Sequence, residues 1–318
     1  MPTIPYISWL GHGAANLAPP GVFTDAKAAL FVIEADTAAM QKLVDTLLNP
    51  AGGGVVRYEP VGPVAMLSFM DIARCTSGTD IAGWLPGREA AVWIPLVELH
   101  PGSPLEDRLV MWSPYIFINY TIGMVIGRED WGWPKVLADI AVASDGQSAP
   151  AYSVTTTYFP TLAAETQGVT GKLYGVTGGS TLHPQQPGWR DGIEAIEAFT
   201  GALLGGAASA LIKALNLSPQ APSVALKQFR EPGAPQTACY QAITDSPIAV
   251  TAFHGGGPLD GPWEVEVTTC ESHPIVQDLL GRAPDPGSTK LPVKFAAWVA
   301  IDFEALAGRT IVAAAHTA

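Results

Sequence analysis

The sequence predicts a strand-dominated α+β protein with a largely antiparallel, barrel-like core. Three observations support this prediction: short apolar runs separated by turns, many Gly (33) and Pro (28) residues, and few charged residues (14%). Frequent turns between short apolar runs are typical of strands, and only two segments show a clear helical period. With 318 residues, of which 48% are hydrophobic, the chain can bury a large core.

The first half of the chain is expected to hold one helix among strands. Residues 1–26 are irregular, and Ala29–Ala35 is predicted to form a strand. Asp36 then caps a helix over Thr37–Leu48, where apolar residues recur at helical spacing. Pro95 predicts an edge or a bulge, because it has no amide hydrogen for the sheet. The other predicted strands are Val55–Tyr58, Val64–Ile72, Ala90–Leu99, Leu109–Met111, Tyr115–Tyr120 and Ile122–Ile126.

The second half adds a long helix and then returns to strands. Residues 177–188 indicate a loop, and Asp191–Leu215 is expected to be a helix with acidic residues early and Lys213 late. No repeat of solenoid or propeller length is present, so residues 1–318 are expected to form a single domain. The predicted strands are Tyr152–Tyr158, Lys172–Val176, Val224–Phe229, Thr237–Thr244, Ile248–Phe253, Trp263–Thr269, Val293–Ile301 and Thr310–Ala313.

Charge and cysteine content exclude several classes of partner. The net charge is −12 and no basic run occurs, so neither nucleic acid nor an anionic membrane is an expected partner. The N-terminus lacks a signal-peptide pattern, and no stretch is apolar enough to span a bilayer. Cys75, Cys239 and Cys270 are far apart and lack metal-ligand spacing, so we expect no metal site and a cytoplasmic location.

The segment Gly127–Lys135, with the sequence GREDWGWPK, is the strongest candidate for chemistry. Pro134 fixes its own φ and Gly132 permits unusual backbone angles, so the segment can hold Lys135 in a defined pose. The apolar neighbours of Lys135 favour its burial. A free lysine has a pKa of about 10.4, and burial lowers it, which increases the fraction of nucleophilic neutral amine.

The pattern G-R-E-x-x-x-x-P-K resembles the signature around the Schiff-base lysine of the acetoacetate decarboxylase family, with Lys135 on the family's nucleophile. The resemblance implies a cone-like α+β core, a keto-acid substrate, no metal or organic cofactor, and a homo-oligomer. It also implies that the helix around 191–215 belongs to an insertion at about 177–220. The sequence departs from the family at Val136, where the decarboxylases have a second lysine.

This resemblance implies a role for each residue of the candidate site. Lys135 forms an iminium with the substrate ketone, and Glu89 shuttles protons as general acid and base. Arg128 either binds a substrate carboxylate or supports the site together with Glu129, and Trp133 forms a pocket wall. Three activities stay open: decarboxylation, condensation of pyruvate with an aldehyde followed by dehydration, and binding of a hydrophobic keto compound without catalysis.

Overall fold

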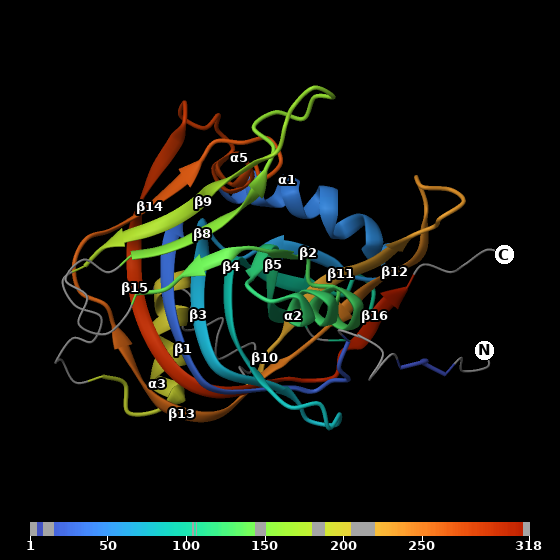
Figure 1. The fold of residues 1–318 in the computed structure, drawn as a ribbon, viewed down its shortest axis with the longest axis horizontal. Helices are drawn as coiled ribbons and strands as arrows, with labels where there is room; N and C mark the ends of the chain where they lie inside the picture. Colours follow the sequence, from blue (N-terminus) through green and yellow to red (C-terminus); the bar gives the residue numbers. More distant parts are fainter. Residues whose placement is uncertain are drawn as a thin grey trace.

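The computed structural model describes residues 5–8, 16–103, 105, 107–143, 151–179, 188–204 and 220–313, and the structural statements below concern these residues (Figure 1). The fold is built on a 16-stranded, mainly antiparallel sheet. Figure 1 shows its longest strands as arcs that curve around an interior, and the sheet does not close into a barrel. The predicted α+β fold with a cone-like core is therefore confirmed.

Five long strands form the curved wall of the molecule. They pair in the order β5-β4-β3-β1-β15, so segments from both ends of the chain meet in one wall. Their bounds are β1 Gly21–Glu34, β3 Val64–Ser77, β4 Leu85–Leu99, β5 Arg108–Ile118 and β15 Ser288–Ala305.

Shorter strands extend this wall on both sides. The sheet continues from β5 to β11, β12 and β16, and from β15 to β14, β9, β8 and β7. The bounds are β2 Arg57–Pro60, β6 Lys135–Leu137, β7 Asp139–Ala141, β8 Ala151–Tyr158, β9 Val169–Gly178, β10 Gln220–Ala221, β11 Ser223–Arg230, β12 Ala238–Asp245, β13 Ile248–Pro258, β14 Trp263–Thr268 and β16 Arg309–Ala313.

Helices α1 (Thr37–Leu47) and α5 (Ile275–Leu280) pack together at one end of the sheet (Figure 1). As the sequence predicted, Asp36 caps α1: its Oδ1 accepts a hydrogen bond from the Ala39 amide at 2.7 Å. The Asp36 amide in turn donates to the Leu279 carbonyl at 2.6 Å, which ties the start of α1 to α5. A 3₁₀ turn, η1 (Asn49–Gly52), follows α1.

The prediction of a strand at Ile122–Ile126 is wrong. This segment lies in α2 (Thr121–Ile126), which continues into the π-helix η2 (Gly127–Trp131). A short apolar run fits a buried strand and a buried helix equally well, and tertiary packing decides between them. Here a Cβ at Gly123 would lie 2.5 Å from the Tyr120 ring and 2.6 Å from Ile118, so the glycine allows the helix to pack tightly against the end of β5.

Pro95 lies where β4 changes its pairing partner. On one side, the pairing with β3 ends at Trp93 and the pairing with β2 begins at Leu96. On the other side, the pairing with β5 shifts register between Val92 and Ile94. The predicted irregularity is present, although β4 is a central strand rather than an edge.

Helix α3 (Gly192–Leu204) begins where the sequence predicted, at Asp191, whose Oδ1 accepts hydrogen bonds from the Ile193 and Glu194 amides. The rest of the predicted helix, up to Leu215, lies outside the described residues, as does much of the proposed insertion at 177–220. Within the described part of the chain, no helix is both long and apolar enough to cross a membrane.

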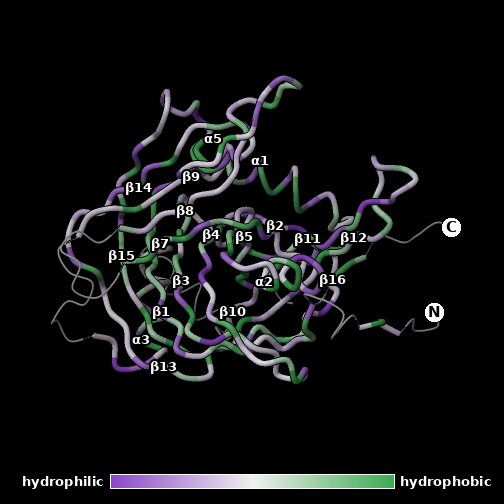
Figure 2. Tube along the Cα trace, viewed as in Figure 1, coloured by the Kyte–Doolittle hydropathy of each residue, from purple (hydrophilic) through white to green (hydrophobic). Residues whose placement is uncertain are grey.

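Alternate residues of β3 face two different apolar regions. Leu67 and Phe69 belong to the main core, where Phe69 packs against Phe31, Tyr152 and Tyr174 with ring centroids 5.3–6.2 Å apart. Figure 2 shows that hydrophobic residues recur along these central strands. The residues between them, Met66, Ser68, Met70 and Ile72, line a cavity on the other face of the wall.

Candidate active site

The chain reaches Lys135 through a tightly packed turn. The π-helix ends at Gly132, which has φ +81°, a conformation that favours glycine. A Cβ at Gly132 would also lie 2.7 Å from the Lys227 backbone, so β11 leaves no room for a side chain. Lys135 then starts β6, which pairs in parallel with β5 and places Lys135 beside Ile116.

Two tryptophans hold this turn against the rest of the fold. Trp131 and Trp133 stack with their ring centroids 4.9 Å apart. Trp131 Nε1 donates to the Leu306 carbonyl at 2.9 Å, and its own carbonyl accepts from Thr244 Oγ1 at 2.6 Å. The lysine segment is therefore anchored to β12 and to the end of β15.

Gly127 makes room for the stem of Lys135. A Cβ at position 127 would lie 2.4 Å from Lys135 Cδ and 2.8 Å from Cε. The backbone of Gly127 is in the ordinary right-handed helical region (φ −55°), so the glycine is required by space rather than by backbone conformation. This contact explains why the pattern that begins at Gly127 and ends at Lys135 starts with a glycine.

Lys135 and Glu89 form a buried ion pair. Lys135 Nζ donates to Glu89 Oε2 at 2.5 Å, and the two side chains are 6% and 22% exposed. Glu89 lies within β4, opposite Ile118 of β5 and Met70 of β3. The Lys135 amine also lies 4.9 Å from the centroid of the Trp133 ring, which is within range of a cation–π interaction.

The groups around this pair keep their protons at neutral pH. Burial raises the pKa of Cys75 to about 11, and the Glu89 carboxylate adds to that rise. Burial also raises the pKa of Tyr120 and Tyr174 well above the usual tyrosine range, and Glu89 contributes to both shifts. Among these residues, Lys135 and Glu89 form the ion pair.

A cavity of about 190 Å³ opens beside this pair. Glu89 and Trp133 are part of its wall, and the Lys135 amine contacts both of these residues. Most of the wall is apolar, and its charged residues are Arg88 and Glu89. The lining residues are Phe23, Leu30, Met66, Ser68, Met70, Ile72, Arg88, Glu89, Trp93, Met111, Ile116, Ile118, Tyr120, Trp133, Ser223, Ile248, Ile301, Phe303 and Ala305.

The structure brings together Lys135, Glu89 and Trp133 but places Arg128 and Glu129 away from the cavity. Arg128 is exposed, and its Nη1 donates to the Lys135 carbonyl at 3.3 Å, so it braces the backbone of the lysine. Glu129 is also exposed and accepts a hydrogen bond from Asn16 Nδ2 at 2.9 Å. Neither side chain is positioned to contact a molecule in the cavity.

Sequence reasoning missed Tyr120, which lines the cavity. Tyr120 comes directly before α2, and nothing in the local sequence distinguishes it from a core aromatic residue. Arg88 also borders the cavity, but its guanidinium lies on the other face of β4: its Nε donates to Asp71 Oδ1 at 2.9 Å, and its Nη1 donates to the Ile140 carbonyl at 3.2 Å.

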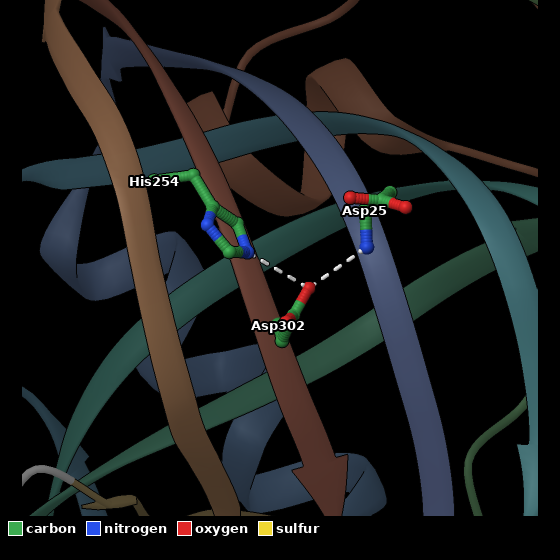
Figure 3. Close-up of side chains that lie close together, drawn as sticks. All are labelled: Asp25, His254 and Asp302. Carbon is green, nitrogen blue, oxygen red and sulfur yellow. Dashed lines mark hydrogen bonds and ion pairs between the residues drawn. The ribbon is translucent and has the colours of Figure 1, made fainter.

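A separate cluster on the outer side of the wall contains Asp25, His254 and Asp302, whose candidate ligand atoms lie within 4.8 Å of one another. Figure 3 shows His254 and the Asp25 amide both directed at Asp302 from neighbouring strands. Asp302 Oδ1 accepts from the Asp25 amide at 2.8 Å and is 3.0 Å from His254 Nε2. Asp302 alternates along β15 with Ile301 and Phe303, which line the cavity, so this cluster is not part of the candidate site.

Comparison with known proteins places this geometry in a family. The sequence pattern of the acetoacetate decarboxylase family matches residues 4–169. Two solved acetoacetate decarboxylases have similar folds. One, from Legionella pneumophila, is 14% identical to this chain, with a TM-score of 0.64. The match covers 98% of this chain and 93% of the Legionella chain. The other is 13% identical with a TM-score of 0.63, covering 98% and 97%.

A third similar structure belongs to a biosynthetic enzyme. It is the enduracididine biosynthesis enzyme MppR, solved with the condensation product of pyruvate and imidazole 4-carboxaldehyde. It is 14% identical to this chain, with a TM-score of 0.56, and the match covers 95% of this chain and 93% of MppR. No curated protein sequence matches the chain.

The family and the fold together define an enzyme of the kind that processes keto acids. The chain belongs to the acetoacetate decarboxylase family, whose pattern spans over half of its length.

Proposed function

We propose that this protein is a lyase that decarboxylates a keto acid through a Schiff base on Lys135. The observation that carries the proposal is the part-buried pair of Lys135 Nζ and Glu89 Oε2, 2.5 Å apart, in which Glu89 belongs to the wall of a mainly apolar cavity. An amine that passes its proton to a neighbouring carboxylate is the starting point for attack on a ketone.

The first stage forms the iminium. The Lys135 ammonium gives a proton to Glu89, and the neutral amine attacks the ketone carbon. The carbinolamine that results loses its hydroxyl as water, with Glu89 as the proton donor, and leaves a C=N⁺ bond. The pKa values of Cys75, Tyr120 and Tyr174 are all raised, so these groups are poor proton donors. Glu89 is therefore the group suited to these proton transfers.

The second stage breaks the carbon–carbon bond. In a 3-oxo acid, the electrons of the bond to the carboxylate flow into the iminium, which releases CO₂ and leaves an enamine. Glu89, which gave its proton to the leaving hydroxyl, takes up a proton from solvent and passes it to the enamine carbon. Water then hydrolyses the iminium to release the ketone and the lysine amine. The decarboxylation step converts a carboxylate and an iminium into neutral CO₂ and a neutral enamine. The apolar wall favours it because charged groups are poorly solvated there.

Arg88 borders the cavity, but its side chain is not suited to bind the carboxylate of the substrate. Adjacent residues of a strand point to opposite faces of the sheet. Glu89 reaches Lys135 on one face, whereas the Arg88 guanidinium donates to Asp71 and to the Ile140 carbonyl on the other.

One observation favours a second activity, the condensation of pyruvate with an aldehyde followed by loss of water. Val136 stands where the decarboxylases of the family carry a second lysine, so the amine has no neighbouring cation from that position. The same iminium would lose a proton to Glu89 instead of CO₂, and the enamine would then attack an aldehyde. Release of CO₂ separates the two reactions, because condensation produces none.

The test is borohydride trapping with acetoacetate, followed by peptide mass analysis. We expect a reduced adduct on Lys135 and release of CO₂ from the untreated reaction. Lys135→Arg should abolish both, and Glu89→Gln should lower the rate of CO₂ release by at least about a hundredfold. Lys290→Arg is the matched control, since Lys290 pairs with Glu264 at 2.7 Å on the surface.

Three results would count against the proposal in different ways. An adduct with pyruvate and an aldehyde, without CO₂ from acetoacetate, would support the condensing activity. Binding of ketones without any reduced adduct would support a non-catalytic binder. Full activity of Lys135→Arg would exclude the Schiff-base mechanism altogether.

A further inference from the structure

We infer that the substrate carries a bulky, uncharged apolar tail on its ketone carbon, such as a phenylalkyl or medium-chain alkyl group. This inference rests on the proposed function and specifies its substrate class. It is drawn from three features of the cavity: its size, the position of its charged residues and the composition of its far end.

The cavity is longer than acetoacetate or pyruvate. Its volume is about 190 Å³, somewhat more than an apolar cavity of about 150 Å³ that holds one benzene molecule. Acetoacetate has only a four-carbon chain, so it does not extend from Glu89 to the far end of the lining. A longer substrate covers the apolar wall at that end and gains binding free energy with every buried CH₂.

The strand register gives the cavity a polar head and an apolar tail end. Glu89 of β4 is paired with Met70 of β3 on one side and with Ile118 of β5 on the other. Four residues further along β4, Trp93 faces Met66, and this end of the lining lies roughly 13 Å from Glu89 at about 3.3 Å per residue. A keto acid whose carboxylate and ketone occupy the head therefore directs its tail towards Met66 and Trp93.

The tail end contains no charged side chain among the described lining residues. Two of its polar groups are hydrogen-bonded to each other: Trp93 Nε1 donates to Ser68 Oγ at 2.9 Å. Methionines at positions 66, 70 and 111 supply flexible apolar surface that adapts to irregular shapes. A charged tail would lose its hydration here without compensation, so the wall selects an uncharged apolar group.

The experiment compares acetoacetate with 3-oxo-5-phenylpentanoate, with CO₂ release corrected for the spontaneous reaction. We expect kcat/KM to be higher for the phenyl compound by about tenfold or more, because each buried CH₂ contributes roughly a fourfold gain. Met66→Trp should lower the ratio of the two kcat/KM values by at least about tenfold, since it fills the tail end. Met66→Ala, which enlarges that end, should not lower the ratio below one.

A binding measurement separates this inference from the proposed function. Calorimetric titration with 4-phenylbutan-2-one and with acetone should show tighter binding of the phenyl ketone, and Met66→Trp should remove the difference. The control Leu162→Trp changes an exposed residue outside the cavity and should preserve the difference.

The possible results lead to distinct conclusions. Tight binding of the phenyl ketone without any adduct on Lys135 would refute the lyase and leave the ligand class standing. Turnover of acetoacetate at equal or higher kcat/KM, together with equal binding of the two ketones, would overturn the apolar-tail inference and leave the lyase standing. If neither ketone binds and no adduct forms on Lys135, both proposals fail.

Discussion

Gly127 and Lys135 are packed so closely that a methyl group on the glycine would lie 2.4 Å from Cδ of the lysine. The backbone at Gly127 is helical, with φ −55°, so alanine fits the chain there without strain. The three atoms nearest to such a methyl group all belong to the aliphatic stem of Lys135.

The first prediction follows from this contact. Gly127→Ala should leave the melting temperature within a few degrees of the wild type, because the backbone tolerates alanine. It should nevertheless lower turnover by at least about a hundredfold, because the lysine must swing away from Glu89 to relieve the clash. Steady-state kinetics and thermal melting measure the two effects.

A control for this prediction is Gly201→Ala, in α3, where an added Cβ meets nothing within 4 Å. It should leave turnover unchanged and raise the melting temperature slightly, because alanine favours a helix interior over glycine. Gly132→Ala should instead lower the melting temperature, because residue 132 has φ +81° and lies against the Lys227 backbone. An active Gly127→Ala enzyme would show that the position of Lys135 does not depend on this contact.

The second prediction concerns Arg88. Its guanidinium binds Asp71 and the Ile140 carbonyl on the face of β4 opposite to Glu89, so Arg88→Met should leave KM for acetoacetate nearly unchanged. Arg128→Met should also change KM little, because Arg128 is exposed and donates to the Lys135 carbonyl. A large rise in KM for Arg88→Met in steady-state kinetics would show that its guanidinium contacts the substrate.

The sequence could predict most of the candidate site because its members near the lysine lie in one short segment. Lys135, Trp133 and Gly127 belong to a continuous pattern, and Glu89 was found by resemblance to a strand of the family. The cavity was not predictable in the same way. Its wall is assembled from β1, β3, β4, β5, β11, β13 and β15, and no local spacing reports which of these strands become neighbours.

The elements that were predicted well carry strong local signals. The cap at Asp36 and the apolar period of the following helix specify α1 without reference to the rest of the chain. The apolar run at Ile122–Ile126 has no such signal, and its helical state depends on how Gly123 packs against Tyr120.

The third prediction concerns a buried network of charges remote from the cavity. Glu98 is 1% exposed and accepts hydrogen bonds from Arg108 Nε at 2.7 Å and from Tyr58 at 2.9 Å, while Arg108 also binds Asp245 at 2.8 Å. Glu98→Ala would leave Arg108 with an incomplete set of partners. We expect a loss of about 3–5 kcal/mol in the free energy of unfolding, measured by urea denaturation.

A surface ion pair provides the comparison for Glu98. Lys294 and Glu34 are 2.9 Å apart but more than half exposed, so Glu34→Ala should cost less than about 1 kcal/mol. Equal effects of the two substitutions would show that burial does not control the strength of the Glu98 network.

The fourth prediction concerns the pH dependence of stability. Burial raises the pKa of Asp278, and the hydrogen bond from Tyr115 and the charge of Lys42 offset this only in part. An acid with a raised pKa in the folded state contributes its full stability below its ordinary pKa of about 3.9 and loses it as the pH rises through the folded value. Asp278→Asn keeps an acceptor for Tyr115, so its melting temperature should rise relative to the wild type between pH 4 and pH 7.

Asp302 should show the opposite slope. The amide of Asp25 and then the side chain of His254 lower the pKa of Asp302. Its stabilising contribution is therefore present above its ordinary pKa and is lost as the pH falls through the lower folded value. Melting curves of Asp302→Asn should show a deficit at pH 7 that disappears in strong acid, and a parallel slope for both variants would contradict these assignments.

The indole N–H of Trp131 reaches the Leu306 carbonyl, one residue beyond the last cavity-lining position of β15. The turn that carries Lys135 and the wall proposed to bind the substrate tail are therefore directly hydrogen-bonded to each other, although they are far apart in the chain. Directed evolution towards a substrate with a different tail would also change kcat. Compensating substitutions are expected near Trp131 rather than at Lys135.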